Sequence, residues 1–411
     1  MMSFSEIIED VHKNWYLYAS MPIVASIIGY VTKLVAIRMM FEPIEFIGIK
    51  PMLGWQGIVP RRAARMASIA VDTMTSKLIS VREIFGRLDP ERVAQEIEKP
   101  LLLSVDEITR EVMAQHQPGL WESLPIQIQN LIVSRIQADA PGIVKELMAD
   151  VKENIENLFD LKHMVIENLV RDKHLLNDIF RKAGAGEFRF IARSGIYFGF
   201  AIGLVQMVTW AATHSKLIMP LFGLFTGWFT DWLALKMVFN PKQPVRYLGL
   251  FEWQGLFLKR REEVAAEYGK LVAEEILTPR NIIEGVLRGP LSDRLFAVIT
   301  RHVKQLVDRE VGLARPFVAL AVGSRQYQAM KDSVANKLIA TLPDTLKAME
   351  SYAGDAMDIK NTLVNKMQEL SAEDFEGLLR PAFQQDEWIL ITVGAVLGFM
   401  VGELQVFLMT H

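Results

Sequence analysis

Residues Met21 to Arg62 read MPIVASIIGYVTKLVAIRMMFEPIEFIGIKPMLGWQGIVPRR, and residues Met219 to Arg260 read MPLFGLFTGWFTDWLALKMVFNPKQPVRYLGLFEWQGLFLKR. The two stretches are identical at 12 of 42 gapless positions, at a constant offset of 198 residues. Each stretch begins with a long apolar run that is followed by a proline, Pro43 or Pro241. Each then continues to a Trp-Gln-Gly motif and ends in a basic pair. Self-similarity at a fixed offset marks a repeated structural unit. We therefore expect two copies of one unit in this chain.

A second pair of apolar stretches extends the repeat to the whole chain. At an offset of 199 residues, the set Gly195, Gly199, Phe200, Gly203 and Gln206 matches the set Gly394, Gly398, Phe399, Gly402 and Gln405. Each unit then contains two membrane crossings, so both copies share one orientation. The expected arrangement is a pseudo-two-fold axis along the membrane normal.

The apolar content predicts that part of the chain is covered by lipid. Hydrophobic residues make up 51% of the 411 residues, and the mean hydropathy is +0.19. A helix needs about 20 apolar residues to cross a bilayer, and the segments 15–41, 194–213, 217–239 and 388–409 meet this requirement. The expected fold class is an all-α integral membrane protein with four transmembrane helices from an internal duplication.

The polar remainder predicts two helical soluble domains, at 42–190 and 240–387. Apolar residues recur there at helical spacing, as in Ala63, Met66 and Ile69, and no convincing strand alternation is present. Each copy is expected to form about five to seven amphipathic helices. Their apolar stripes have two interpretations, the core of a helical bundle or a surface that contacts lipid.

Basic residues predict which side of the membrane the domains occupy. Four crossings place both domains on one face and both termini on the other. Only Lys13 and Lys216 flank the membrane on the terminal side. The domain side has Lys50, Arg61, Arg62, Arg65, Arg181, Lys182, Arg189, Arg193, Lys242, Arg246, Lys259, Arg260 and Arg261. The positive-inside rule then makes the domains cytoplasmic.

Small residues repeat every four positions in each membrane segment. This spacing forms a smooth stripe that lets helix backbones approach closely in lipid. The stripe has two interpretations: packing within a four-helix bundle, or a face for homo-oligomerisation. Its residues are Ala25, Gly29, Gly195, Gly199, Gly203, Gly223, Gly227, Gly394, Gly398 and Gly402.

Two charges of opposite sign lie well inside the membrane segments at equivalent positions of the repeat. Lys33 is in the first segment, and Asp231, 198 residues further on, is in the third. Charges inside a bilayer usually pair or face a polar cavity, so we expect an intramembrane Lys33–Asp231 pair. Two alternatives stay open. The charges could form a polar path for ions or protons with Thr32, Thr230 and Glu403, or they could snorkel separately to the interface.

Each odd-numbered membrane segment is followed by an elbow of similar composition. Proline ends the helix, tryptophan suits the headgroup layer, and a basic cluster attracts anionic lipid. The elbow is either a rigid connector or a lipid-headgroup site. Its residues are Trp55, Arg61 and Arg62 in the first copy, and Trp253, Lys259, Arg260 and Arg261 in the second.

The chain carries no recognisable catalytic motif. Its seven histidines lack metal-ligand spacing, and it has no Walker loop, nucleophile elbow or HExxH motif. The absence of cysteine excludes disulfides, cysteine zinc sites and a cysteine nucleophile. We predict no catalytic residue, metal or cofactor. The net charge of −3 does not favour nucleic acid as a partner.

Two motifs resemble a bacterial membrane-protein family, the YheB/YjiN-like group with domain of unknown function 445. The first is Gly29 to Pro43 (GYVTKLVAIRMMFEP) followed by GIVPRR at 57–62, and the second is Phe375 to Glu387, which leads into Gly394. Lys33 departs from the family pattern, which usually has asparagine there. The resemblance implies a helical protein of a bacterial membrane and supplies no activity.

These features favour a non-enzymatic scaffold or envelope-organising protein of the cytoplasmic membrane, assembled as a homo-oligomer and in contact with membrane lipids, including anionic ones. The membrane part is small for a transport pathway within one chain, and most of the chain is soluble helical mass. Two alternatives remain: a transporter or channel that uses the intramembrane charges, and a lipid-binding or lipid-transfer protein.

Overall fold

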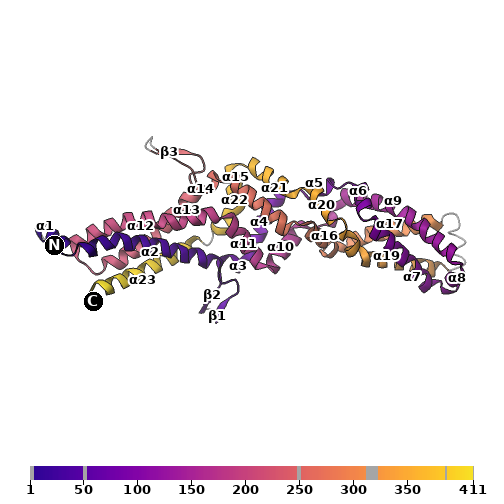
Figure 1. Cartoon of the computed structure of the whole chain (residues 1–411), viewed down its shortest axis with the longest axis horizontal. Helices are drawn as coiled ribbons and strands as arrows, with labels where there is room; N and C mark the ends of the chain where they lie inside the picture. The colour runs from indigo at the N-terminus through magenta and orange to yellow at the C-terminus, as the bar shows by residue number, and fades with distance from the viewer. Residues whose placement is uncertain (1–3, 50–52, 248–250, 312–322, 385–386, 411) are drawn as a thin grey trace. The chain divides into compact units, whose positions relative to one another are not determined.

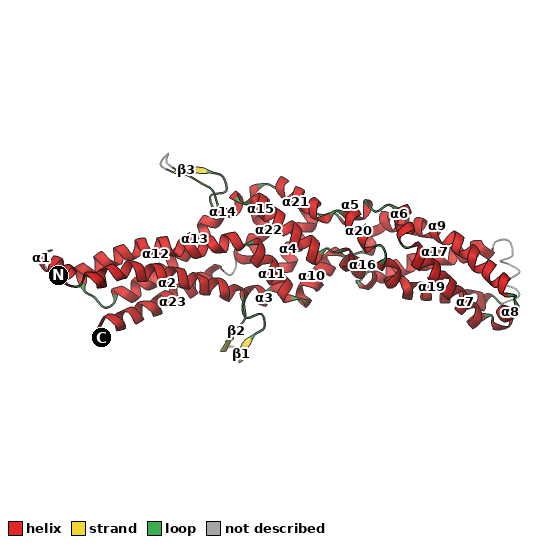
Figure 2. Cartoon of the chain, in the orientation of Figure 1, coloured by secondary structure: helices red, strands yellow, loops and turns green. Residues whose placement is uncertain are grey.

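The computed structural model describes all residues except 1–3, 50–52, 248–250, 312–322, 385–386 and 411. Lys50, one of the predicted flanking basic residues, lies outside the described residues. The chain divides into two compact units, each of which draws on both halves of the sequence. Unit 1 consists of Met1–Met74, Leu169–Leu271 and Val364–His411, and unit 2 consists of Thr75–Asn168 and Val272–Leu363. Helices dominate both units (Figure 2), which confirms the all-α fold class.

Unit 1 contains the four apolar helices and the segments that follow them (Figure 1). Its elements are α1 (Phe4–Lys13), α2 (Trp15–Phe41), β1 (Ile47–Ile49), β2 (Leu53–Trp55), α3 (Ile58–Arg61), most of α4 (Ala63–Lys77), α11 (Lys173–Ala183), α12 (Ala185–Thr213), α13 (Ile218–Phe239), β3 (Val245–Tyr247), β4 (Phe251–Trp253), α14 (Leu256–Lys259), α15 (Arg261–Leu271), α22 (Ala372–Gln384) and α23 (Glu387–Thr410).

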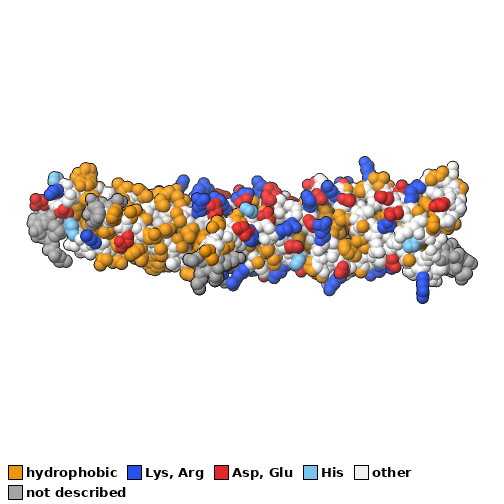
Figure 3. Space-filling view, turned by 90° about the horizontal axis from the view of Figure 1, so that it is seen from below, with side chains coloured by type: hydrophobic (Ala, Val, Ile, Leu, Met, Phe, Trp, Pro, Cys, Tyr) orange, Lys and Arg blue, Asp and Glu red, His pale blue; other side chains and the backbone are white. Residues whose placement is uncertain are grey.

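Four helices are long and apolar enough to cross a membrane: α2, α12, α13 and α23. Three of the four predicted segments lie within these helices, and the segment 217–239 begins one residue before α13, at its N-cap Leu217. Helix α12 begins at Ala185, upstream of the predicted segment, because the basic stretch before Ser194 continues the same helix. Large apolar side chains on the outer faces are exposed, such as Tyr197 at 72% and Val208 at 64%. In Figure 3 hydrophobic side chains dominate the visible surface of these helices, as expected for a surface that faces lipid.

Two short antiparallel hairpins interrupt the helices of unit 1, and the sequence did not predict them. Strand β1 pairs with β2, with Ile47 opposite Trp55, and β3 pairs with β4, with Val245 opposite Trp253. Figure 1 shows both hairpins projecting away from the neighbouring helices. Each strand has only three residues, so no alternating pattern long enough to recognise was available.

The elements of unit 1 recur along the chain at the spacing of the sequence repeat. The hairpins begin at Ile47 and Val245, and the short helices that follow them begin at Ile58 and Leu256. Both spacings equal 198 residues. The same order of elements is therefore present in both halves, while the origin of the halves by duplication stays a prediction.

Unit 2 is made of helices from both halves. Its elements are α5 (Val81–Gly86), α6 (Pro90–Glu96), α7 (Glu98–His116), α8 (Pro118–Ser123), α9 (Ile126–Leu158), the π-helix η1 (Val272–Ile276), α16 (Pro279–Arg288), α17 (Ser292–Val311), α19 (Ser324–Lys347) and α20 (Glu350–Met357). Helices α10 (Leu161–Arg171) and α21 (Ile359–Glu369) cross the boundary between the units. Helix α9 packs against α6, α7 and α17, and buries Val133, Val151 and Ile155.

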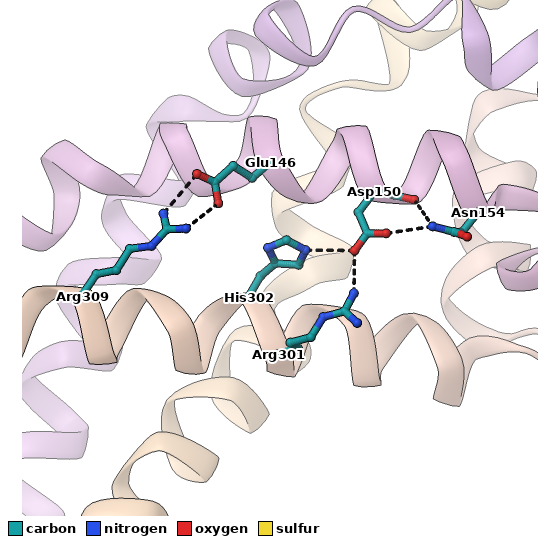
Figure 4. Close-up of polar contacts among 6 residues, drawn as sticks. All are labelled: Glu146, Asp150, Asn154, Arg301, His302 and Arg309. Carbon is teal, nitrogen blue, oxygen red and sulfur yellow. Dashed lines mark hydrogen bonds and ion pairs between the residues drawn. The ribbon is translucent and has the colours of Figure 1, made fainter.

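A polar network joins α9 to α17 within unit 2 (Figure 4). The Arg309 guanidinium donates to both carboxylate oxygens of Glu146, at 3.0 and 3.1 Å. One oxygen of Asp150 lies 2.6 Å from Arg301 Nη2 and 3.1 Å from His302 Nε2. The hydrogen bond with His302 and the charge of Arg301 hold the pKa of Asp150 below its ordinary value.

We expect this network to make unit 2 sensitive to acid. Because the folded-state pKa of Asp150 is depressed, its contribution is complete above the unfolded value of 3.8 and is lost as pH falls through the folded value. Arg301 is largely exposed, which limits the contribution to about 1 kcal/mol. Asp150→Asn should reduce the difference between the thermal unfolding midpoints at about pH 6 and about pH 3. Glu153→Gln, which changes an exposed carboxylate of the same helix, should leave that difference as in the wild type.

Candidate functional site

The small-residue stripes of the first copy meet each other between α2 and α12. A Cβ built on Gly29 would lie 2.3 Å from the Gly195 carbonyl oxygen, and one built on Gly195 would lie 2.2 Å from that of Gly29. One turn further, a Cβ on Gly199 would lie 2.5 Å from the Ala25 carbonyl oxygen. Gly203 approaches Pro22 in the same way. The two backbones are therefore in direct contact along this seam, which only small residues permit.

The second copy forms an equivalent seam between α13 and α23. A Cβ built on Gly227 would lie 2.0 Å from the Gly394 carbonyl oxygen, and one built on Gly398 would lie 2.1 Å from that of Gly223. A Cβ on Gly402 would lie 2.5 Å from the Met219 carbonyl oxygen. All ten predicted small residues thus pack inside the chain in these two seams, each of which joins the two apolar helices of one copy.

Lys33 and Asp231 meet between the two copies. Lys33 Nζ lies 2.6 Å from Asp231 Oδ1 and donates to Thr230 Oγ1 at 3.0 Å. Their side chains are 0% and 6% exposed. The glycines of the seams make room for both charges, because a Cβ on Gly394 would collide with Asp231 Oδ2 and one on Gly195 would lie 3.0 Å from Lys33 Cδ. The pair is a buried contact that links α2 to α13.

The other members of the predicted polar path do not join this cluster in the same way. Thr32 is buried, and its hydroxyl donates to the Ile28 carbonyl oxygen of its own helix at 2.8 Å. Glu403 lies on the exposed surface of α23. Within the described residues, the buried polar contact therefore comprises Lys33, Thr230 and Asp231.

A cavity lies next to the charge pair at the end of the apolar helices, where α11 and α14 pack against them. It has about 820 Å³ of empty space, which includes open solvent at its mouth. Its walls are mainly apolar side chains, with Lys33, Glu187, Asp231 and Glu387 as the charged members. The apolar wall residues include Ala36, Ile37, Met40, Phe180, Phe188, Ile191, Leu235, Val238, Phe257 and Leu390. Such a lining suits an apolar chain better than a hydrated ion.

The two elbows share a closed loop that explains the Trp-Gln-Gly motif. In the first elbow, Gly57 N donates to the Pro43 carbonyl oxygen at 2.8 Å, and Gln56 Nε2 donates to that of Ile44 at 2.8 Å. In the second, Gly255 and Gln254 make the same bonds to Pro241 and Lys242. Both prolines follow cis peptide bonds. The glycine is required because its Cβ would collide with the backbone at the end of the preceding helix.

The predicted basic residues of the elbows have different roles in the structure. Arg260 lies 2.9 Å from Glu187 and 2.8 Å from Glu263. Burial opposes its charge, but the hydrogen bonds and charges of these carboxylates outweigh burial and raise the pKa of Arg260. Arg261 donates to the carbonyl oxygens of Met367, Gln368 and Leu370 at the end of α21. Arg61 and Lys259 are exposed, Arg62 is half-buried, and Trp55 is half-buried beside the first hairpin.

Beside the second elbow, the structure forms a groove that the sequence did not predict. Arg189, Arg193 and Tyr197 of α12 line it together with Trp253 and Arg260. The groove has about 1100 Å³ of empty space, including solvent, and the Trp253 ring lies 5.9 Å from that of Phe190. Trp253 and Arg260 were predicted as site residues, whereas Arg189 and Arg193 were recognised only as flanking charges. The spacing of four residues could have predicted that these two arginines share one face of a helix. It could not have predicted that this face lies opposite Trp253.

A second polar cluster, also not predicted, joins α1 to the connection between α12 and α13. His214 Nε2 lies 2.9 Å from Asp10 Oδ2, and the Tyr18 hydroxyl donates to the same carboxylate. Hydrogen bonds from Tyr18 and then His214 lower the pKa of Asp10. His214 adopts a left-handed conformation with φ of 50°, which ends α12 and turns the ring toward Asp10. No group of three or more His, Cys, Asp or Glu side chains suited to a metal was found among the described residues.

The chain is similar to known membrane proteins over part of its length. A stretch of 63 residues is 46% identical to a UPF0754 membrane protein of Bacillus cereus strain AH187 and to one of Bacillus thuringiensis subsp. konkukian strain 97-27. The stretch covers 15% of this chain and 16% of each relative. No protein-family model matches the chain. No solved structure matches it significantly. Together with the four apolar helices, these relatives indicate a membrane protein.

Proposed function

We propose that this chain is a non-enzymatic scaffold of the bacterial inner membrane, built as a multi-pass four-helix base that carries helical cytoplasmic domains. The buried Lys33–Asp231 contact is the observation that carries the proposal. It pairs two intramembrane charges of opposite sign that the repeat assigns to equivalent positions, and it ties the first copy to the second. A base closed by an ion pair and two glycine seams is suited to anchoring rather than conduction.

The finer family assignment is part of the same proposal. The motifs at 29–43, 57–62 and 375–387 support membership of the YheB/YjiN-like group with domain of unknown function 445. The recurring hairpins, elbows and seams support an origin of the two halves by duplication. The excess of basic residues next to the soluble segments supports a cytoplasmic location for them.

The rest of the site supports a structural role over transport. The cavity next to the charge pair has mainly apolar walls, whereas a path for ions requires hydrated or polar surfaces. Glu403, the third charge of the predicted path, is exposed. Because both seams are filled within one chain, a homo-oligomer would form through other surfaces, such as the exposed apolar faces of the membrane helices.

Two measurements on the full chain test the proposal. Native mass spectrometry after extraction in native lipid should give a homo-oligomer, and liposomes containing the chain should be no more permeable to protons or potassium than empty liposomes. A strictly monomeric mass would contradict the scaffold. Ion flux that is lost in the paired variant Lys33→Met with Asp231→Leu would instead support the transporter alternative.

A further inference from the structure

We propose that the groove between α12 and the second elbow binds the headgroup of an anionic phospholipid. The site goes beyond the scaffold function, and its cationic members are Arg189 and Arg193. These two arginines are one helical turn apart on α12, and both are exposed. Within the described residues neither makes an ion pair. Arg189 Nε donates only to the Ala185 carbonyl oxygen of its own helix, at 3.3 Å.

The third guanidinium of the groove has a different role, because Arg260 is held by two carboxylates. Its contacts with Glu187 and Glu263 fix the guanidinium beside Gly186, where a side chain would collide with it. Arg260 therefore builds the wall of the groove, while Arg189 and Arg193, which make no ion pair within the described residues, supply the positive charge for a ligand. Guanidinium groups bind phosphate through paired N–H donors.

The apolar part of the groove fits the rest of a phospholipid molecule. Trp253 and Tyr197 lie beside the two arginines, and tryptophan and tyrosine favour the headgroup layer. From this point the outer face of α12 continues as exposed apolar residues, which would lie along acyl chains. These residues are Ile196, Tyr197, Phe200, Leu204, Val205 and Val208. Free phosphate would use only the cationic end of this surface.

The other copy of the repeat lacks the cationic pair. At the offset of 199 residues that relates α12 to α23, the positions equivalent to Arg189 and Arg193 hold Trp388 and Thr392. The positive-inside rule does not explain why α12 has this pair of arginines and α23 lacks it, because other basic residues flank the membrane segments of both copies. The comparison predicts one anionic-lipid site per chain, in the groove of the second elbow.

The test measures lipid binding to the full chain by native mass spectrometry. Nanodiscs of phosphatidylcholine are titrated with phosphatidylglycerol, and retained phosphatidylglycerol is counted for each variant. Loss of two headgroup contacts of about 1 kcal/mol each predicts roughly thirtyfold weaker retention in Arg189→Gln with Arg193→Gln. The matched control is Arg61→Gln with Lys259→Gln, which removes the same charge from exposed elbow positions outside the groove and should weaken retention much less.

Further measurements distinguish binding of the lipid from binding of other anions and from misfolding of a variant. Inorganic phosphate should not displace phosphatidylglycerol, and phosphatidylcholine alone should not be retained. If the double variant does not fold, the single variant Arg193→Thr takes its place in the test. It introduces the residue found at the equivalent position of α23 and should weaken binding, whereas Arg193→Lys should keep most of the binding. Equal loss in both double variants, wild-type retention in the Arg189/Arg193 variant, or displacement by phosphate would overturn the site.

Discussion

Replacing Gly227 by valine is expected to force α13 away from α23 and to destabilise unit 1 by about 3 kcal/mol. A Cβ at this position would lie 2.0 Å from the Gly394 carbonyl oxygen and 2.5 Å from its carbon. These are backbone atoms, which cannot rotate away as a flexible side chain could, so the helices must separate. Lipid tails are as apolar as the side chains, and no hydrophobic gain offsets the lost packing and the displaced Asp231.

The effect can be measured as the SDS mole fraction at the midpoint of unfolding in mixed micelles. Gly195→Val, which changes the equivalent seam between α2 and α12, should lower the midpoint by a similar amount. Gly142→Ala is the control, since a Cβ there meets nothing within 4 Å on α9, and it should be neutral or stabilising by up to about 1 kcal/mol. An unchanged midpoint for Gly227→Val would show that the seam is not tightly packed.

Features that depend on the repeat could be predicted from the sequence. The offset of 198 residues assigned Lys33 and Asp231 to equivalent positions, and equivalent positions near a shared axis lie close together. The structure places the two charges 2.6 Å apart. Glycine spacing likewise indicated the faces along which the apolar helices approach each other. For the charge pair, a residue of one half of the sequence indicated which residue of the other half lies close to it.

Features that depend on contacts between distant segments could not be predicted in this way. The groove forms because Trp253 of the second elbow packs beside Phe190 of α12, and no periodicity reports a contact between those segments. The same holds for His214 and Asp10, which are far apart in sequence. The two compact units also interleave both halves of the chain, whereas apolar patterning only divides the sequence into consecutive segments. Strands of three residues are too short for a pattern to be visible.

Removing one member of the intramembrane pair is expected to have the largest effect of any single substitution. Lys33→Met leaves Asp231 buried without a cation, and Asp231→Leu leaves the Lys33 ammonium with only Thr230 as a partner. Breaking a buried pair in this way costs about 3 to 5 kcal/mol, because the remaining charge stays desolvated. The measurement is again the SDS midpoint of unfolding. Arg38→Ala, which breaks an exposed pair between α2 and Glu42, the residue that follows this helix, should cost less than about 1 kcal/mol.

Combining the two substitutions should restore most of the lost stability. Lys33→Met with Asp231→Leu removes both charges and leaves apolar groups of similar length, and such replacements of buried pairs are often neutral or stabilising. The coupling energy of the double-mutant cycle then reports the interaction itself. A double variant as unstable as the sum of the single ones would show that the two residues act independently.

The reversed pair, Lys33→Asp with Asp231→Lys, tests whether the two halves are structural copies. Each native charge lies beside a glycine at an equivalent position, Lys33 beside Gly195 and Asp231 beside Gly394. If the halves are related by a pseudo-two-fold axis, the space around one charge can accept the other, and the reversed pair should recover at least half of the loss caused by either single substitution. Reversal that is as damaging as Lys33→Met would mean that the surroundings of the two charges differ. The pair would then be a local contact, and the repeat in sequence would not extend to the packing of the membrane base.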